Sequence, residues 1–388
     1  MKIVVISPRL PYPLEKGDKL RLYHQLKVLA KKHEIVLISL SDVDVNTMDI
    51  EHLKSFVSDI HVFKLSRLKI ALRLMFGVFS DLPFQVLYFF NRKIKKEIHS
   101  IIKSVKPDFI YNQLLRTAEY TKDIESFKII DYMDSFSQGM KKRLGNSSFP
   151  FSFIYNLEYK RLKAYETKIF SYYDKHLIIS EQDRNSFAPS IKDRINVMPN
   201  GVDIDFFCPG EYAKVYDIGF VGNMGYRPNI IASEFLIKEI FPLLKNYYNN
   251  IRIVLAGARP HNRVKSLESD DVIVTGWVED IRKPYGEAKI FVAPIFTGIG
   301  QQNKILEAMS MQIPVITTSG VNNAIGAKSG SELLIADNAK SFADHIIFLL
   351  ENNQFAHDLG IKGRDFVKNN YSWDYQGKKV LELFSKKI

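Results

Sequence analysis

Short apolar runs that alternate with amphipathic segments constrain the fold of this chain more than any other feature. Each run is a few residues long and is bounded by turn residues. In the first half the runs are Ile3–Ser7, Ile35–Ser39, Ile60–Phe63, Phe109–Asn112, Lys128–Ile130, His176–Ile179 and Asn196–Met198. Segments with helical spacing lie between them, such as Lys19–Lys31, Ile94–Val105 and Tyr155–Tyr172. This alternation is typical of a parallel, doubly wound α/β sheet.

The same pattern restarts in the second half of the chain. Its runs are Asp217–Val221, Ile251–Ala256, Val272–Thr275, Ile290–Ala293, Val315–Thr317 and Leu333–Ile335. A turn-rich segment over 199–210 separates the two patterns. We therefore expect a first domain at 1–198, a second at 199–370, and a helix at 371–388 that crosses back onto the first. Two such domains facing a cleft bind ligands beyond the carboxyl ends of their strands.

Length and composition exclude several classes of protein. The chain has 388 residues, of which 46% are hydrophobic and 25% charged, so collagen, coiled coil and extended disorder are excluded. The single cysteine, Cys208, permits no internal disulfide, which fits a reducing compartment. The first apolar run stops at Pro8, too early for a signal peptide, and no stretch approaches the roughly 18 apolar residues of a spanning helix. We expect a cytoplasmic protein, peripheral on the inner membrane face.

The net charge of +11 is confined to the first half. Residues 1–200 hold 33 Lys and Arg against 22 Asp and Glu, and residues 201–388 hold 21 against 21. The basic residues concentrate over 64–106, where ten face only Asp81 and Glu97. Such a segment favours an anionic surface as its partner.

The loop after the first run is a candidate anion site. It leads through Gly17 and Asp18 into a helix, and Gly17 lets the backbone approach a ligand while the first N–H groups of the helix favour phosphate. It contains neither a Rossmann Gly-x-Gly-x-x-Gly nor a P-loop. An ordinary strand-to-helix turn with Asp18 as N-cap is the alternative.

A second candidate lies between the runs that end at Pro294 and begin at Pro314. Here Gly298 and Gly300 precede Lys304 and Glu307, whose spacing puts a cation and a carboxylate on one helix face. Backbone donors and Lys304 would hold a diphosphate, and Glu307 would accept ribose hydroxyls. A surface ion pair between the two side chains is the alternative.

An ordered set of motifs resembles a known family. The set is Pro199-Asn200-Gly201-Val202-Asp203, Phe220-Val221-Gly222, Val274-Thr275-Gly276-Trp277-Val278-Glu279-Asp280, Gly298-x-Gly300-x-x-x-Lys304-x-x-Glu307 and Ile313-Pro314-Val315-Ile316. It is similar to glycosyltransferase family 4, the retaining GT-B enzymes also called group 1. In the first domain, Pro11-Tyr12-Pro13 followed by Gly17-Asp18-Lys19-x-Arg21 resembles a branch of exopolysaccharide sugar transferases.

The resemblance implies a GT-B fold of two Rossmann-like domains and a nucleotide-sugar donor held mainly by the second. It also implies an acceptor on the first domain, with no metal and no separate cofactor. Glu307 would hold the ribose and Lys304 would meet the diphosphate. The donor site would comprise Gly17, Asp18, Asn200, Gly222, Arg227, Val278, Gly298, Gly300, Gln301, Gln302, Asn303, Lys304 and Glu307.

The chain departs from the family pattern at two places. The usual first carboxylate before Glu307 is Ile299, so contacts to the sugar would come from backbone or from Gln301, Gln302 and Asn303. The usual Arg after Gly222 is Asn223, and the usual Lys beyond it is Pro228, which leaves Arg227 as the nearest replacement. The diphosphate is thus expected to meet fewer cations than in the family.

Three residues are candidates for the chemistry. Lys304 and Glu307 act on the donor, and Asp134 follows a predicted strand at the end from which it would enter the cleft. A helix N-cap or a solvated turn is the alternative for Asp134. None of the nine histidines has the spacing of a metal site, so we expect no metal.

The basic segment also carries an apolar face. Its members, at helical spacing, are Leu65, Leu68, Leu72, Met75, Phe76 and Phe79. Beside Arg92, Lys93, Lys95 and Lys96 this face suits a helix in the interface of an anionic membrane. The alternative is a helix packed on its own domain. Nucleic acid is disfavoured because no nucleic-acid module is recognised.

We expect a metal-independent retaining glycosyltransferase that moves a sugar from a nucleotide donor to a saccharide or lipid-linked saccharide in surface polysaccharide or glycan assembly. Two alternatives stay open: a GT-B sugar-nucleotide epimerase, and a non-catalytic GT-B partner subunit, the latter suggested by Ile299 and Asn223.

Overall fold

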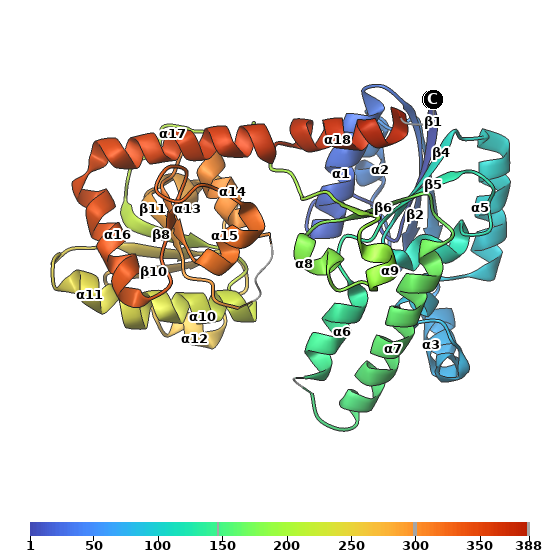
Figure 1. Ribbon diagram of the computed structural model, residues 1–388, viewed down its shortest axis with the longest axis horizontal. Coiled ribbons are helices and arrows are strands. Elements are labelled where there is room, and N and C mark those ends of the chain that lie inside the picture. Colours follow the sequence, from blue (N-terminus) through green and yellow to red (C-terminus); the bar gives the residue numbers. More distant parts are fainter. Residues whose placement is uncertain (146, 298–300, 386–388) are drawn as a thin grey trace. The chain divides into compact units, whose positions relative to one another are not determined.

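The computed structural model describes residues 1–145, 147–297 and 301–385, and the chain forms two compact units (Figure 1). The first unit comprises Met1–Pro199 together with the residues from Gly377 on, and the second is Asn200–Gln376. Each unit is a parallel sheet with helices on both faces, so the α/β class predicted from the alternation is confirmed.

The sheet of the first unit has seven strands in the order β3-β2-β1-β4-β5-β6-β7. The strands are β1 (Lys2–Ser7), β2 (Glu34–Ser41), β3 (Asp59–Lys64), β4 (Phe109–Gln113), β5 (Phe127–Asp131), β6 (Lys175–Ile178) and β7 (Ile195–Val197). Each apolar run expected in this half lies on one of them. The register is parallel throughout, with Val4 of β1 opposite Val36 of β2 and Ile110 of β4.

Helices cover both faces of this sheet. They are α1 (Gly17–Ala30), α2 (Thr47–Lys54), α3 (Arg67–Phe76), α4 (Phe84–Phe89), α5 (Arg92–Val105), α6 (Phe136–Leu144), α7 (Phe151–Phe170), α8 (Glu181–Arg184) and α9 (Pro189–Lys192), with 3-10 turns at Gly77–Phe79 and Leu115–Tyr120. Successive residues of β1 enter opposite cores. Ile3 packs with Leu26 of α1, and Val4 packs with Ile98 of α5. A strand that is buried on both faces must be apolar at every position, which explains the continuous run Ile3–Ile6.

One face of the first unit is completed by a segment from the far end of the sequence. Helix α18 (Trp373–Ser385) begins in the second unit, and its residues from Gly377 on belong to the first. The Phe384 ring lies edge-on to Phe109 of β4 at 5.1 Å between ring centres. Gly377 lies against Val28 of α1 so closely that a Cβ there would clash with the valine.

The sheet of the second unit has six strands in the order β10-β9-β8-β11-β12-β13. The strands are β8 (Tyr216–Val221), β9 (Ile253–Ala256), β10 (Val272–Gly276), β11 (Ala288–Ala293), β12 (Val315–Thr317) and β13 (Leu334–Ile335). The helices are α10 (Arg227–Phe235), a π-helical turn (Leu236–Ile240), α11 (Phe241–Lys245), α12 (Asn262–Lys265), α13 (Arg282–Gly286), α14 (Asn303–Ser310), α15 (Ser319–Ile325), α16 (Ala339–Glu351) and α17 (Asn353–Asn370).

The strand orders define one special position in each sheet. The order reverses between β1 and β4 in the first unit and between β8 and β11 in the second. Loops leave the two strands in opposite directions at such a point and open a crevice at their carboxyl ends. Functional residues are therefore expected at these two crevices. Among the described residues, no helix is both long and apolar enough to cross a membrane.

Candidate nucleotide site and acceptor side

Lys304 and Asn229 meet at the crevice of the second unit. Lys304 is the second residue of α14, which follows β11, and its ammonium donates a hydrogen bond to Asn229 Oδ1 on α10. The ammonium also lies 5.1 Å from the centre of the Phe220 ring on β8. Burial lowers the pKa of Lys304 to about 8, an effect that the negative charge of Glu307 opposes.

Glu307, one turn further along α14, has a different partner. Its Oε2 accepts a hydrogen bond of 2.8 Å from the hydroxyl of Tyr285, a buried residue of α13. Burial raises the pKa of Glu307, and the Tyr285 hydroxyl and the Lys304 charge oppose this shift. Both charged residues lie in the described part of the chain, and no ion pair joins them. The alternative of a surface ion pair is therefore wrong.

Gly222, which follows β8, has to be small. A Cβ at this position would lie 2.8 Å from Asn229 Nδ2 and 3.0 Å from the Lys304 ammonium. The carbonyl of Gly222 also presses on Gly257, where φ is +137° and a Cβ would clash with that oxygen. The loops after β8 and β9 thus approach each other closely, and the backbone at Gly222 lies directly beside Asn229 and Lys304.

Asn200 and Gln301 are joined through a paired contact. The Asn200 backbone N–H donates to Gln301 Oε1 at 2.8 Å, and Gln301 Nε2 donates to the Asn200 carbonyl oxygen at 2.7 Å. Both polar atoms of the Gln301 amide are engaged in this contact. Gln301 therefore fixes the segment around Asn200 next to the start of α14.

The remaining predicted donor residues of this unit are more scattered. Arg227 is the exposed first residue of α10, and Val278 is half-buried in the loop after β10. Gln302 is the N-cap of α14 and Asn303 its first residue. Gly298 and Gly300 lie outside the described residues. Asn229 and Tyr285 were not predicted. In the sequence, only their positions could have pointed to them. Asn229 follows Pro228, where the chain departs from the family pattern, and Tyr285 comes shortly before a strand.

Gly17 and Asp18 belong to the first unit. Helix α1 begins at Gly17 and its N-cap is Lys16, so the interpretation of Asp18 as N-cap is wrong. Asp18 instead forms an ion pair of 2.5 Å with Arg9, which follows β1. A Cβ on Gly17 would meet nothing within 4 Å, so space at the start of α1 is open.

A buried ion pair supports this edge of the sheet. Arg21 of α1 and Asp131, the last residue of β5, are fully buried and lie 2.7 Å apart. Tyr111 of β4 donates to the same Asp131 oxygen at 2.8 Å, and the backbone N–H of Met133 donates to the other at 3.0 Å. The pair fixes α1 and the loop that carries Asp134 to the sheet.

Asp134 lies just beyond the carboxyl end of β5. It is exposed, and the preceding Met133 has φ of +62°, a strained conformation for a side chain of this kind. Desolvation by the surrounding protein, and secondly the charge of Asp183, raise the pKa of Asp134 to about 6. The N-cap of α6 is Ser135, so the interpretation of Asp134 as a cap is wrong.

The apolar face predicted in the basic segment is exposed. Leu68, Leu72, Met75, Phe76 and Phe79, on α3 and the turn after it, keep 45–90% of their surface accessible. Packing on the protein's own domain is therefore wrong for these five side chains, while Leu65 is buried as that alternative requires.

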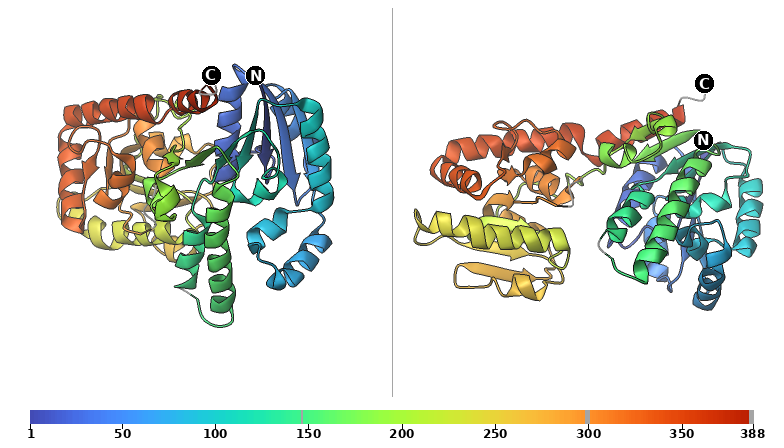
Figure 2. Two further views of the ribbon diagram at one scale, coloured as in Figure 1. Left: turned by 45° about the vertical axis from the view of Figure 1, so that its right-hand side comes forward. Right: turned by 60° about the horizontal axis from the view of Figure 1, so that its bottom comes forward.

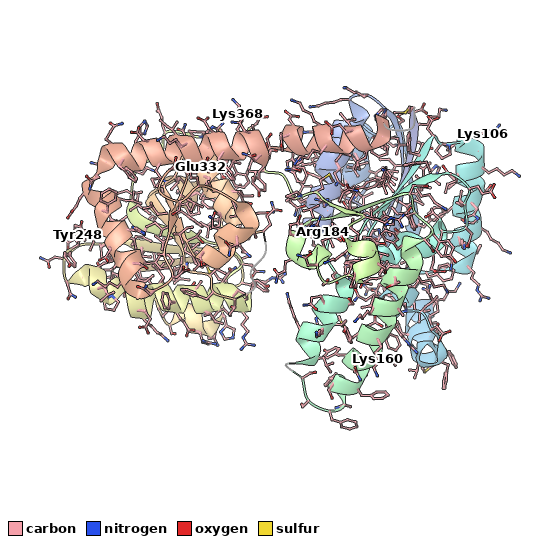
Figure 3. All side chains as sticks on the ribbon, in the orientation of Figure 1. Lys106, Lys160, Arg184, Tyr248, Glu332 and Lys368 are labelled. Atoms are coloured by element: carbon pink, nitrogen blue, oxygen red, sulfur yellow. The ribbon has the colours of Figure 1, made fainter. Side chains whose placement is uncertain are left out.

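The basic residues of 64–106 do not form one patch. Lys64 pairs with Asp44, and Lys95 pairs with Asp123 at 2.6 Å. Arg92, Lys93 and Lys96 are exposed in the first turns of α5, whereas Lys106 lies at the other end of that helix (Figure 3).

The sequence analysis missed a second exposed apolar segment, at the start of α7 and just before it. Its members are Phe149, Phe151, Phe153 and Ile154, which are 44–84% exposed. The α6–α7 hairpin and α3 extend from the same end of the first unit (Figures 1 and 2). Three exposed basic residues, Lys141, Lys142 and Arg143, precede the hairpin tip.

Within residues 1–145, 147–297 and 301–385, no cluster of His, Cys, Asp and Glu could hold a metal ion.

Comparison with solved structures identifies the fold. A glycosyltransferase from Rickettsia africae superimposes with a TM-score of 0.68 at 18% identity, covering 99% of this chain and 98% of that one. Anabaena HepE in complex with UDP gives a TM-score of 0.68 at 13% identity, covering 99% and 100%. The fold is therefore GT-B, with two Rossmann-like domains.

Sequence comparison is consistent with this fold. Residues 215–352, which include Gly222, Lys304 and Glu307, match the family of group 1 glycosyl transferases. An uncharacterized 44.6 kDa protein in the cps region of Klebsiella pneumoniae is 22% identical over 392 residues, covering 95% of this chain and 96% of that protein. The matched residues lie within the second unit.

Proposed function

We propose that this protein is a retaining glycosyltransferase that moves a sugar from a nucleotide-sugar donor to a saccharide or lipid-linked saccharide during surface polysaccharide assembly. The observation that carries the proposal is the pair of separately held charges on α14, Lys304 on Asn229 and Glu307 on Tyr285. The cps-region relative favours the polysaccharide context.

The donor would bind in the crevice of the second unit. Glu307 is an anionic acceptor suited to two adjacent ribose hydroxyls, and Tyr285 holds one of its oxygens in place. Gly222 brings backbone close to the Lys304 ammonium, where backbone N–H groups would add donors for a diphosphate. UDP is the first nucleotide to test, because HepE was solved with it.

Lys304 would contribute most as the sugar leaves. Departure of the nucleoside diphosphate concentrates negative charge on the bridging oxygen, and a positioned cation stabilises that charge in the transition state. The half-buried ammonium is poorly solvated, so its interaction with the diphosphate is stronger than that of an exposed lysine. We propose that this cation replaces a metal ion, so that chelators leave the activity unchanged.

The acceptor would bind to the first unit. Asp134 lies at the carboxyl end of β5 with a raised pKa, which suits a group that positions an acceptor hydroxyl or receives its proton. The exposed apolar side chains of α3 and of the α6–α7 hairpin, with basic residues nearby, favour docking on an anionic membrane at the inner face of the cell.

The test has two steps, a binding screen and a transfer assay with radiolabel or mass detection. In the first step the full chain is screened by thermal shift against nucleoside diphosphates and their sugars, because a ligand that binds only the native state raises the melting temperature. The stabilising sugar nucleotide is then incubated with lipid extract, with and without EDTA. Transfer with retained anomeric configuration supports the proposal. Interconversion of sugar nucleotides without nucleotide release indicates an epimerase, and no nucleotide binding indicates a non-catalytic subunit.

A further inference from the structure

A cavity of about 310 Å³ opens at the crevice of the first unit. Two arginines line it, each just after one of the strands between which the sheet order reverses. Arg9 follows β1 and Arg116 follows β4. Both lie near the Phe89 ring, with the guanidinium carbons at 5.8 Å and 5.5 Å from its centre. The crevice therefore presents two cations beside one aromatic ring.

The direct contacts of the Arg116 guanidinium are to neutral groups. One terminal nitrogen donates to Gln85 Oε1 at 2.7 Å and the guanidinium stacks on Phe136, but Nε makes no hydrogen bond. No carboxylate of the described chain forms an ion pair with it, whereas Arg9 pairs with Asp18. Burial, and secondly the charge of Arg9, lower the pKa of Arg116 to about 10, while the negative charges of Asp18 and Asp134 oppose the shift. A half-buried guanidinium that forms no ion pair of its own keeps donors for an anionic ligand.

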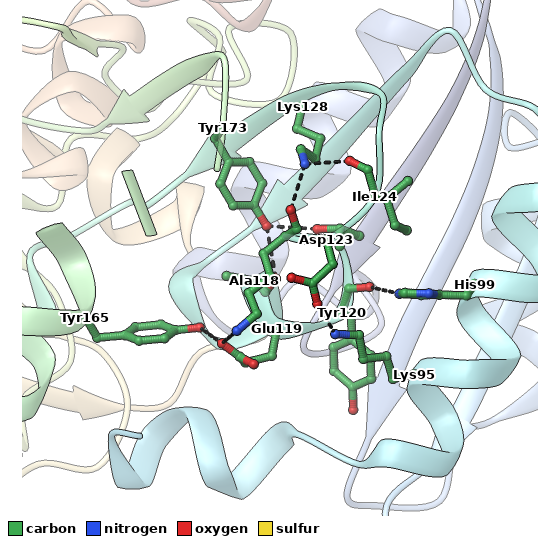
Figure 4. Close-up of polar contacts among 12 residues, drawn as sticks. Lys95, His99, Ala118, Glu119, Tyr120, Asp123, Ile124, Lys128, Tyr165 and Tyr173 are labelled. Atoms are coloured by element: carbon green, nitrogen blue, oxygen red, sulfur yellow. Dashed lines mark hydrogen bonds and ion pairs between the residues drawn. The ribbon is translucent and has the colours of Figure 1, made fainter. Parts of the chain in front are cut away.

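The segment that carries Arg116 is firmly held. Glu119 accepts from Tyr165 at 2.8 Å and from Lys122 at 2.9 Å, and the carbonyl of Tyr120 contacts His99 at 2.8 Å (Figure 4). The Tyr120 hydroxyl donates to the Phe89 carbonyl at 2.7 Å, so the same turn also holds the ring that both arginines face. The Arg116 guanidinium is thus held in a fixed position by this turn, by Gln85 and by Phe136.

Apart from Gln85 and the Tyr88 hydroxyl, the rest of the cavity wall is apolar, and it continues onto the protein surface. Leu74, Phe84 and Tyr88 line the cavity beside the arginines. Leu74 belongs to α3, and the next residues on that helix, Met75 and Phe76, are 59% and 65% exposed. A ligand with an anionic head and an apolar chain would match both parts.

We propose that this cavity binds the phosphate or diphosphate head of an amphiphilic acceptor, with Arg116 as the main anion contact and α3 along the apolar chain. This inference rests on the proposed function in one respect: the ligand of the cavity is taken to be the acceptor of the sugar. Arginine suits this task because its planar guanidinium offers paired donors to phosphate oxygens.

Titration calorimetry of the full chain with farnesyl diphosphate, below its micelle concentration, tests the proposal. Farnesyl diphosphate should bind more tightly than either inorganic diphosphate or farnesol. Arg116→Gln should weaken this binding by about tenfold or more, and Arg116→Lys should restore part of it. The matched control Lys168→Gln removes an exposed charge from α7 and should change the affinity less than about twofold.

A second variant, Leu74→Gln, tests the proposal even if the Arg116 variants fail to fold. Leu74→Gln should weaken binding of farnesyl diphosphate and leave that of inorganic diphosphate unchanged. Equal affinity for the two compounds in the wild type would overturn the amphiphile assignment, and so would full affinity in Arg116→Gln. Displacement of farnesyl diphosphate by UDP would overturn it as well, by showing one shared anion site. UDP titrated into the same preparation tests the second-unit crevice separately. Loss of UDP binding therefore contradicts the proposed function, and loss of farnesyl diphosphate binding contradicts the cavity assignment.

Discussion

The ammonium of Lys304 is held by the amide oxygen of Asn229, a residue of a different helix on the far side of the Gly222 loop. The Asn229 Nδ2 group in turn donates to the Asn223 carbonyl at 2.9 Å. The cation is therefore positioned before any ligand arrives, which lowers the entropic cost of organising it in the transition state.

Lys304→Ala should reduce the rate of sugar transfer by on the order of 100-fold, while UDP affinity falls by less, because the charge contributes most as the diphosphate leaves. Asn229→Ala should reduce the same rate by a smaller factor, about tenfold, since the ammonium remains but is no longer fixed. Steady-state kinetics with a saturating acceptor separate kcat from KM. Asn249→Ala, an exposed asparagine of the same unit, is the control. Equal rates in all variants would rule out a role for Lys304.

Glu307→Gln should weaken UDP binding by roughly 1–3 kcal/mol, because a neutral amide replaces a charged acceptor of hydroxyl groups. Tyr285→Phe should cost about 1 kcal/mol, since it removes only the hydroxyl that holds the carboxylate. Calorimetric titration with UDP measures both. The exposed Glu239 provides the charge-matched control Glu239→Gln. If 2′-deoxy-UDP lost as much affinity in Glu307→Gln as UDP does, Glu307 would not contact the 2′-hydroxyl of the ribose.

UDP affinity should be constant below pH 8 and fall above it. Lys304 has a pKa of about 8 in the free protein, and a bound diphosphate favours its charged form, so the free protein must take up a proton on binding at higher pH. Titrations from pH 6.5 to 9.5 should show this loss, and Lys304→Ala should abolish it. The lowered pKa also means that deprotonation of this group increases folding stability as pH rises from about 8 toward the ordinary lysine pKa of about 10.4.

Asp134→Asn should lower the transfer rate and leave UDP affinity nearly unchanged. The pKa of this carboxyl is raised to about 6 in the folded protein, so its ionised form destabilises the fold above that pH. The melting temperature of Asp134→Asn at pH 7.5 should therefore not fall, and the wild-type rate should rise as pH passes through about 6. Asp193→Asn, an exposed carboxylate of the same unit, serves as the reference. A parallel loss of melting temperature and rate would assign a structural role.

Vesicle cosedimentation should increase with anionic lipid and decrease with salt, because the Debye length shrinks from about 10 Å at 0.1 M to about 3 Å at 1 M. Changing Arg92, Lys93 and Lys96 to Glu should abolish binding, and Phe76→Ser with Phe79→Ser should weaken it at every salt concentration. Lys103→Glu with Lys106→Glu, near the other end of α5, is the matched control. The triple variant should still bind UDP. Salt-insensitive sedimentation of the wild type would contradict an electrostatic contribution.

The sheets could be predicted from sequence because their central strands are buried on both faces. Such strands must be apolar at every position, as at Ile3–Ile6, and the turns that bound them are equally distinct. Lys304 and Glu307 could be predicted for a similar reason, since a spacing of three on one helix is a local property.

Asn229, Tyr285 and Arg116 could not be predicted, because their roles depend on contacts between elements far apart in the sequence. Asn229 is 75 residues from Lys304, and Gln85 is 31 residues from Arg116. The exposure of Phe76 and Phe79 could not be predicted either, because an apolar helix face has the same sequence pattern whether it packs inward or faces solvent.

The contribution of α18 to the first unit has a consequence for biosynthesis. Val380 and Phe384 are part of the core that includes Ile3, Leu26 and Phe109, yet the ribosome makes them after the whole second unit. Until then the nascent first unit exposes an apolar strip beside Val28 and Phe109, where unfinished chains are open to chaperones and to aggregation. A fragment ending at residue 199 would keep that strip exposed. To study the first unit alone, α18 has to be supplied as a separate peptide or joined to it by circular permutation.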